Sequence, residues 1–90
     1  MPNCGRNQAD SAGGTIIGEI ANTVFVNNNV IAVVPDDVAP HGDGEHSSPV
    51  MNEGSSNVFA CGHKVCRKGD KATCGHALSP GSSNVFVNGG

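Results

Sequence analysis

The chain has 90 residues, a formal net charge of −3 and only three aromatic residues, all of them phenylalanine. Proteins that bind nucleic acid carry basic stripes or stacking aromatic side chains, so this composition argues against a nucleic-acid partner. A chain this short forms one domain, residues 1–90, with a thin core, and its thirteen glycines raise the entropy that folding must overcome. Four cysteines and four histidines make disulfides or a structural metal the candidates for additional stability.

The beginning of the sequence, Met-Pro-Asn-Cys-Gly, has no positively charged region followed by an apolar run. We therefore expect no secretory signal, and no apolar stretch approaches the length of a membrane span. Synthesis in the reducing cytoplasm is the expectation, and there thiolate–metal bonds are favoured over disulfides.

A repeated segment organises the chain. The hexapeptide Gly-Ser-Ser-Asn-Val-Phe occurs at residues 54–59 and again at residues 81–86, and a weaker copy occurs at residues 22–27. All three phenylalanines lie in these copies. The pattern predicts three equivalent strands around a pseudo-threefold axis, with phenylalanines that meet or pack equivalently.

Each copy is typical of a strand entered from a turn. The first predicts a hairpin over residues 23–34, which turns at 27–29 and returns through 30–34 before Pro35. The second predicts a turn at 61–63 and a return at 64–67, and the third ends at its turn, residues 88–90. No longer segment has helical periodicity, so we expect an all-β and loop domain.

Two loops between the hairpins contain most of the chemistry. The loop at 36–53 contains His41 and His46, and the loop at 69–80 contains Cys74 and His76. The shorter pattern Cys61-x-His63-x-x-Cys66 also matches a zinc motif, but the repeat places it at a turn and in a returning strand. We therefore interpret this pattern as turn and packing residues.

From residue 54 onward the sequence reads Gly-Ser-Ser-Asn-Val-Phe, then Val-Cys-Arg-Lys-Gly-Asp at 65–70, Thr-Cys-Gly at 73–75, and a second Gly-Ser-Ser-Asn-Val-Phe. This order resembles the final repeat of the PAAR-repeat proteins, which tip the central spikes of type VI secretion systems and contractile phage tails. The resemblance covers nearly the whole chain. In the first third the Gly-Asp pair and the literal Pro-Ala-Ala-Arg string are absent, and Asp10 or Asp36-Asp37 are the nearest counterparts of the Gly-Asp aspartate.

The resemblance implies a small cone of three pseudo-equivalent β-hairpin units that converge on a metal-bound tip. It implies a structural role, without enzymatic activity, as the membrane-piercing cap of a trimeric spike, either a phage central spike or a VgrG-like protein, with one copy per trimer. The target cell envelope and a non-covalently bound effector are the further partners it implies. The expected location is a virion tail and baseplate tip or a secretion apparatus, and the sequence leaves both open.

The family resemblance also implies one structural Zn²⁺ near the tip, held by histidines and cysteines of different repeats. Carried over to this sequence, the expected ligands are Cys4, His41, His46 and Cys74, with His76 as the substitute for Cys4. Two thiolates and two imidazoles fill a tetrahedral shell and leave no position for water, as in structural zinc sites.

Two other functions stay open at this stage. A zinc-dependent hydrolase would need an open coordination site and a general base, and the nearest carboxylates, Asp43 and Glu45, are interpreted as solvated loop residues. A free-standing zinc-binding interaction module needs neither, and binding to a trimeric spike distinguishes it from a cap.

Overall fold

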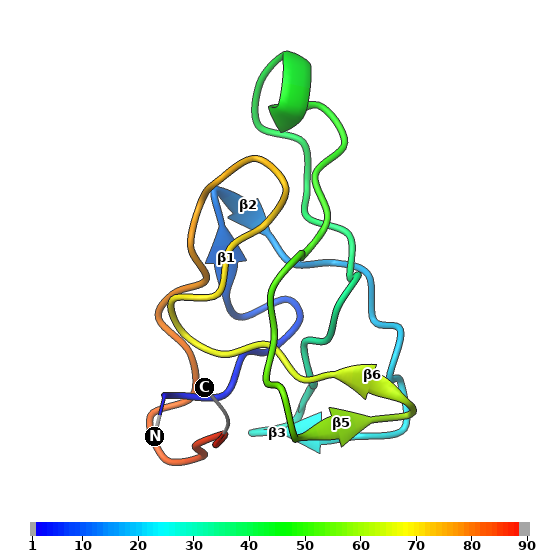
Figure 1. Cartoon of the computed structure of the whole chain (residues 1–90), viewed down its shortest axis with the longest axis vertical. Coiled ribbons are helices and arrows are strands. Elements are labelled where there is room, and N and C mark those ends of the chain that lie inside the picture. Colours follow the sequence, from blue (N-terminus) through cyan, green and yellow to red (C-terminus); the bar gives the residue numbers. More distant parts are fainter. Residues whose placement is uncertain (1, 89–90) are drawn as a thin grey trace.

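The computed structural model describes residues 2–88 and consists of short strands, isolated bridges and turns that taper to a point (Figure 1). Three two-stranded antiparallel sheets pair β1 with β2, β3 with β4, and β5 with β6. The elements are β1 (Ser11–Ala12), β2 (Gly14–Thr15), β3 (Phe25–Val26), β4 (Asn29–Val30), the 3-10 helix η1 (Gly44–His46), β5 (Phe59–Ala60) and β6 (His63–Lys64). The prediction of a small all-β fold is confirmed. Nothing helical within residues 2–88 has the length and apolar character needed to cross a bilayer.

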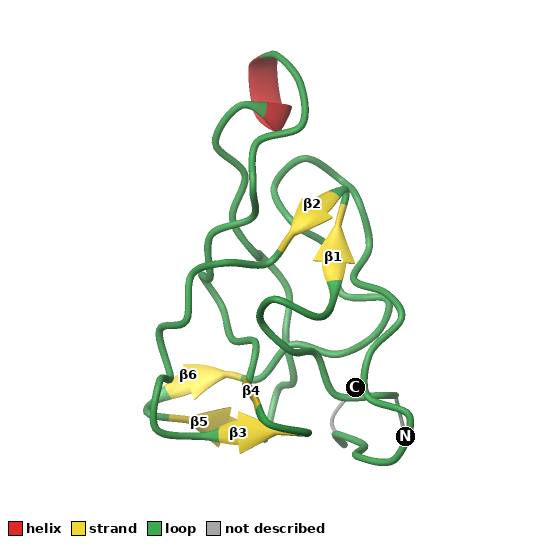
Figure 2. Cartoon of the chain, turned by 180° about the vertical axis from the view of Figure 1, so that it is seen from behind, coloured by secondary structure: helices red, strands yellow, loops and turns green. Residues whose placement is uncertain are grey.

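The wide end of the molecule, called the base below, is built from two hairpins and the two paired ends of the chain (Figure 2). Asn27 and Asn28 turn between β3 and β4 with φ of 51° and 68°, and Cys61 and Gly62 turn between β5 and β6 with φ of 51° and 82°. Two consecutive positive φ values suit the right-handed twist of the flanking strands. Because β4 begins at Asn29 and β6 begins at His63, both turns have two residues, and the sequence-based turns at 27–29 and 61–63 were each one residue too long.

The third hexapeptide copy pairs with the opposite end of the chain. Phe86 bridges Asn3, the amide of Cys4 donates to the carbonyl of Val85 at 2.8 Å, and the amide of Val87 donates to Pro2 at 2.9 Å. The first unit of the fold therefore comprises residues 82–88 together with 2–16, the second unit comprises 21–51, and the third comprises 55–78. Gly89 and Gly90, which belong to the predicted third turn, lie outside the described residues.

Three backbone hydrogen bonds close a ring that joins the units. The amide of Gly5 donates to Cys66 at 2.9 Å, that of Cys66 to Ala32 at 2.8 Å, and that of Ala32 to Gly5 at 3.0 Å. Since each unit donates once and accepts once, the ring follows the pseudo-threefold axis. A Cβ on Gly5 would lie 2.5 Å from Leu78 Cδ1 and 3.2 Å from Ala32 Cβ, so a side chain at residue 5 would crowd its neighbours.

The core is divided into a lower cluster beside the base and an upper cluster toward the tip. In the upper cluster Ile16, Met51 and Leu78 hold equivalent positions, one per unit, and all three are fully buried. The next residue along the chain donates its amide to a neighbouring unit in each case: Ile17 to Asp37, Asn52 to Lys71 and Ser79 to Ser11. The lower cluster is Cys4, Ala21, Val26, Ile31, Val33, Ala60, Val65 and Val87, and the upper is Ala12, Ile16, Ala32, Val38, Met51, Cys66, Ala72, Cys74 and Leu78.

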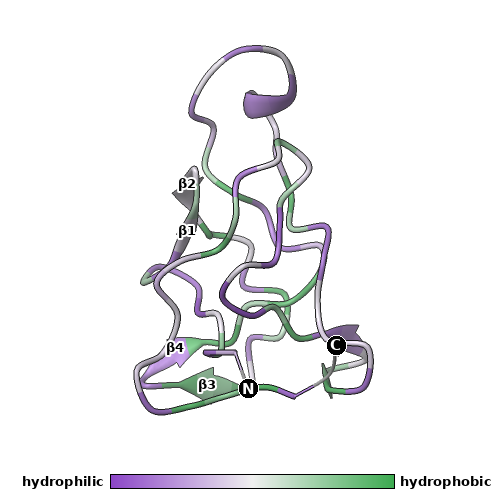
Figure 3. Cartoon of the chain, turned by 60° about the vertical axis from the view of Figure 1, so that its left-hand side comes forward, coloured by the Kyte–Doolittle hydropathy of each residue, from purple (hydrophilic) through white to green (hydrophobic). Residues whose placement is uncertain are grey.

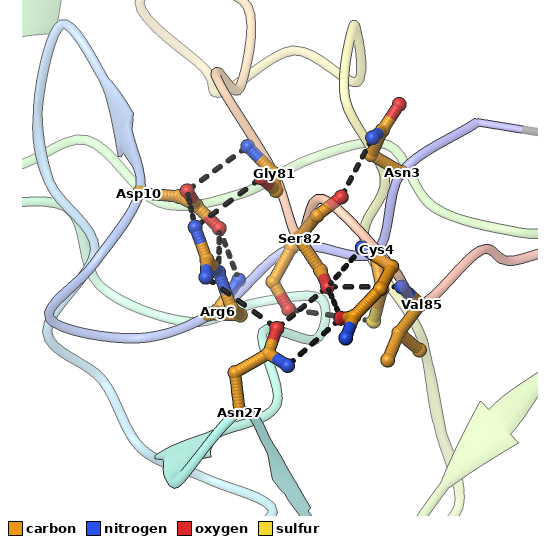
Figure 4. Close-up of polar contacts among 10 residues, drawn as sticks. Asn3, Cys4, Arg6, Asp10, Asn27, Gly81, Ser82 and Val85 are labelled. Carbon is orange, nitrogen blue, oxygen red and sulfur yellow. Dashed lines mark hydrogen bonds and ion pairs between the residues drawn. The ribbon is translucent and has the colours of Figure 1, made fainter.

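Each unit contains one buried aspartate that accepts several hydrogen bonds, and Figure 4 shows the aspartate of the first unit, Asp10. Asp10 accepts from the amide of Arg6 at 2.8 Å and from its Nε and guanidinium at 3.0 and 2.9 Å, and from the amide of Gly81 at 2.9 Å. Asp70 repeats the pattern with Arg67, at 2.7, 3.0 and 2.9 Å. These hydrogen bonds raise the pKa of both arginines.

The second unit keeps the aspartate but replaces the arginine by Val33. Asp36 accepts from the amides of Val33 at 2.8 Å and Ile20 at 3.0 Å, and from the side-chain amide of Asn7 at 3.1 Å. Asn7 and Asp36 are both fully buried. Asp10 and Asp36 are thus the true counterparts of Asp70, although their local sequences lack the Gly-Asp pair.

Asp10→Asn should lower the free energy of unfolding by about 3 kcal/mol, because it leaves the Arg6 guanidinium beside a neutral, partly mismatched group in a largely buried pair. Chemical denaturation measures the loss. Asp37→Asn is the matched control: Asp37 is exposed, and its substitution should change stability by less than about 0.5 kcal/mol. Equal effects of the two substitutions would contradict the bracing role of Asp10.

Candidate metal centre

Four potential metal ligands gather at the narrow end of the molecule. The donor atoms of His41, His46, Cys74 and His76 all lie within 4.8 Å of one another. The three imidazole rings form a triangle with centroid separations of 4.9, 5.0 and 5.2 Å. Cys74 is buried, while His76 is exposed on the outer side of the group. The four side chains come from the two loops in which the sequence concentrates its chemistry.

The tip loop holds His41 and His46 side by side. The amide of His41 donates to the carbonyl of His46 at 2.9 Å, and that of His46 to Asp43 at 3.2 Å. Gly44 begins η1 with φ of 64°, and the hydroxyl of Ser47 donates to its carbonyl at 2.7 Å. These hydrogen bonds join the two ends of the loop, and the imidazole rings of His41 and His46 lie close together.

A second tight turn supplies the other two ligands. The amide of Gly75 donates to Ala72 at 2.9 Å, and the amide of Ala72 donates to His76 at 3.0 Å. Gly75 has φ of 90°, which turns the chain back so that Cys74 and His76 both reach the group. The amide of Thr73 donates to Val50 at 2.8 Å, which fixes this turn against the end of the tip loop.

Hydrogen bonding sets which nitrogens are free to bind. His41 Nδ1 lies 3.0 Å from the carbonyl oxygen of Ala39, which can only accept, so Nδ1 carries the proton and Nε2 keeps its lone pair. His46 Nδ1 lies 3.1 Å from this Nε2. Three imidazoles and one thiolate at such separations suit tetrahedral Zn²⁺ in their donor chemistry.

Cys4, the fourth predicted ligand, is not brought to this group. It is fully buried in the lower cluster, and its thiol lies 3.5 Å from the carbonyl oxygen of Gly5. Burial, with a smaller contribution from the charge of Asp10, raises the pKa of the Cys4 thiol to about 11. Cys4 is therefore a neutral packing residue at physiological pH, and the structure brings His76 to the group in its place.

Cys61, His63 and Cys66, which match a zinc motif in the sequence, lie in three different environments. Cys61 is exposed at the turn between β5 and β6, and His63 begins β6. Cys66 is fully buried in the upper cluster, where burial raises the pKa of its thiol. Their placement at a turn, at a strand and in the core agrees with the interpretation from the repeat.

A family model described as the PAAR motif matches residues 6–80, which is most of the chain. The chain belongs to the PAAR-motif family. Proteins of this family are associated with the spikes of type VI secretion and related contractile systems, and with their effectors.

One curated relative is the double-stranded DNA deaminase toxin A of Burkholderia cenocepacia. It is 43% identical to this chain over 42 residues, which are 47% of this chain and 3% of the toxin. The similarity therefore covers a small part of a much longer protein.

Proposed function

We propose that this PAAR-motif chain is the piercing tip of a contractile injection system, docked as one copy on a trimeric spike and stabilised by one zinc ion. The observation that carries this proposal is the chemistry of the base. Each unit presents one phenylalanine at the equivalent position, and these three large apolar side chains are exposed while the equivalent position after each is buried. The exposed fractions are 60% for Phe25, 55% for Phe59 and 48% for Phe86.

A trimeric spike would cover this base. Figure 3 contrasts the hydrophobic β3 at the base with the hydrophilic η1 at the tip. Exposed aromatic side chains on a small protein mark an interaction surface, and a pseudo-threefold arrangement matches a partner with true threefold symmetry. This geometry supports a one-to-three complex. The sequence predicts phenylalanines that meet or pack equivalently around the pseudo-threefold axis, and in the structure all three are exposed.

The metal in this proposal is held by His41, His46, Cys74 and His76. Bound there, Zn²⁺ would cross-link the tip loop to the turn at 73–76, with a contribution to folding on the order of 10 kcal/mol. Four protein ligands leave no open position for a catalytic water, and this favours a structural site over a hydrolase. The work of the tip is then mechanical, and force would pass along the long axis of the molecule, which extends 33 Å.

Delivery of a toxin is the second part of the proposal. The similarity to a segment of a deaminase toxin supports a role in which the tip carries an effector into the target cell. The effector would travel with the spike when the sheath contracts. The same chemistry at the base would serve a phage tail or a secretion apparatus.

Phe59→Asn should weaken binding to the trimeric spike by at least about tenfold, because an aromatic anchor at the centre of an interface contributes about 2 kcal/mol. Native mass spectrometry gives the stoichiometry, and titration gives the affinity for the spike encoded nearest this gene. Ile17→Asn is the matched control, since Ile17 is an exposed apolar residue outside the hexapeptide copies, with 42% exposure. Failure of the unsubstituted chain to form a one-to-three complex would instead favour a free-standing zinc module.

His76→Ala and Cys74→Ser should each abolish stoichiometric zinc binding and lower the melting temperature, while Cys4→Ala should retain one zinc per chain. Metal analysis of purified protein, with thermal unfolding before and after chelation, measures both effects. Chelation should destabilise Cys4→Ala as strongly as the unsubstituted chain. Loss of zinc in Cys4→Ala with retention in His76→Ala would restore the sequence-based ligand set.

A further inference from the structure

We propose that the β1–β2 turn of the first unit, which offers no ligand, forms the third wall of the metal centre, and that Gly13 and Gly14 are its positioning residues. This inference rests on the proposed metal site. It assigns a role to the one unit that the ligand set leaves out. At Gly13 the space that a side chain would occupy is taken by the imidazole rings of His41 and His76.

Gly13 lies directly against the imidazoles. A Cβ built on it would be 2.5 Å from His41 Nε2, 2.8 Å from His41 Cε1 and 2.7 Å from His76 Cδ2. His41 Nε2 is the nitrogen that would bind the metal, because Nδ1 donates to the carbonyl of Ala39. Any side chain at residue 13 would therefore push against the ligand nitrogen of His41 and against the ring of His76, one histidine from each of the two loops that form the site.

Gly14 acts on the same histidine through its hydrogen-bond partner. A Cβ on Gly14 would collide with the carbonyl oxygen of Ala39, the group that accepts from His41 Nδ1, and would lie 3.1 Å from Nδ1 itself. The amide of Ala39 donates to the carbonyl of Thr15 at 2.8 Å, so Ala39 is held against β2. Because the carbonyl of Ala39 fixes the tautomer of His41, a substitution at Gly14 would disturb the ligand without touching the metal.

The wall also contacts the thiol. Cys74 Sγ lies 3.7 Å from the carbonyl oxygen of Ala12, the residue that pairs with Gly14 across the turn. One short turn thus borders His41, Cys74 and His76. Metal binding would then fix the apex of all three units, although the side chains that bind come from only two.

The test compares Gly13→Ala and Gly14→Ala with Gly69→Ala. Gly13 has φ of 89° and Gly69 has φ of 94°, so alanine is strained equally at both, but a Cβ on Gly69 would meet nothing within 4 Å. Gly14 has no positive φ, so alanine there adds contact without this strain. The three variants separate backbone strain from crowding of the histidines.

Zinc affinity is measured by competition with a chromophoric chelator, and the ligand field by the visible absorption of the cobalt-substituted protein. Gly13→Ala and Gly14→Ala should bind zinc about tenfold or more weakly and shift the cobalt bands, as for changes beside metal ligands. Gly69→Ala should lose stability with and without metal but keep the affinity and the spectrum of the unsubstituted chain.

Unchanged zinc affinity and an unchanged cobalt spectrum in both Gly13→Ala and Gly14→Ala would overturn the inference while leaving the metal site intact. A different result would contradict the proposed metal site itself. If the unsubstituted chain binds no stoichiometric zinc, the site itself is absent. Melting temperatures of the metal-free variants show that each one folds, so a loss of affinity is not mistaken for unfolding.

Discussion

The closed ring of backbone hydrogen bonds among Gly5, Ala32 and Cys66 is the constraint on which the rest of the structure depends. Each bond joins two units, so no unit can move without breaking two of the three bonds. The ring excludes bulk, which explains glycine at one position and small side chains at the others. The core of the chain falls into two clusters, and Ala32 and Cys66 of the ring belong to the upper one.

The three units are alike on the base side of the ring and differ on the tip side. Toward the base the units remain alike, because each hairpin or strand pair turns one phenylalanine outward and buries the next residue. Toward the tip the units diverge in loop length. The second extends its loop to carry His41 and His46, the third makes a tight turn with Cys74 and His76, and the first is reduced to a glycine turn. A base with pseudo-threefold symmetry and a narrow apex support the proposed role as a cap on a symmetric spike.

Sequence reasoning reached the fold because the hexapeptide copies repeat a local rule three times. It also located His41, His46 and Cys74 in the loops that meet. It chose Cys4 over His76 because Cys4-Gly5 echoes Cys74-Gly75, but Cys4 lies on the base side of the ring, where burial is complete. The choice depends on a strand pairing between the two ends of the chain, and no local pattern encodes that pairing. The role of Gly13 was equally hidden, because the contacts of a glycine are visible only when its neighbours are placed.

Native-state hydrogen exchange of the amides of Gly5, Ala32 and Cys66 tests the ring most directly. If the ring joins all three units, these amides open only when the whole chain unfolds, so their exchange free energies should be equal to one another and to the global value. The amides of His46 and Ser47 in the tip loop should exchange through smaller openings. Ring amides that exchange at three different free energies, or as fast as those of the tip loop, would contradict the account.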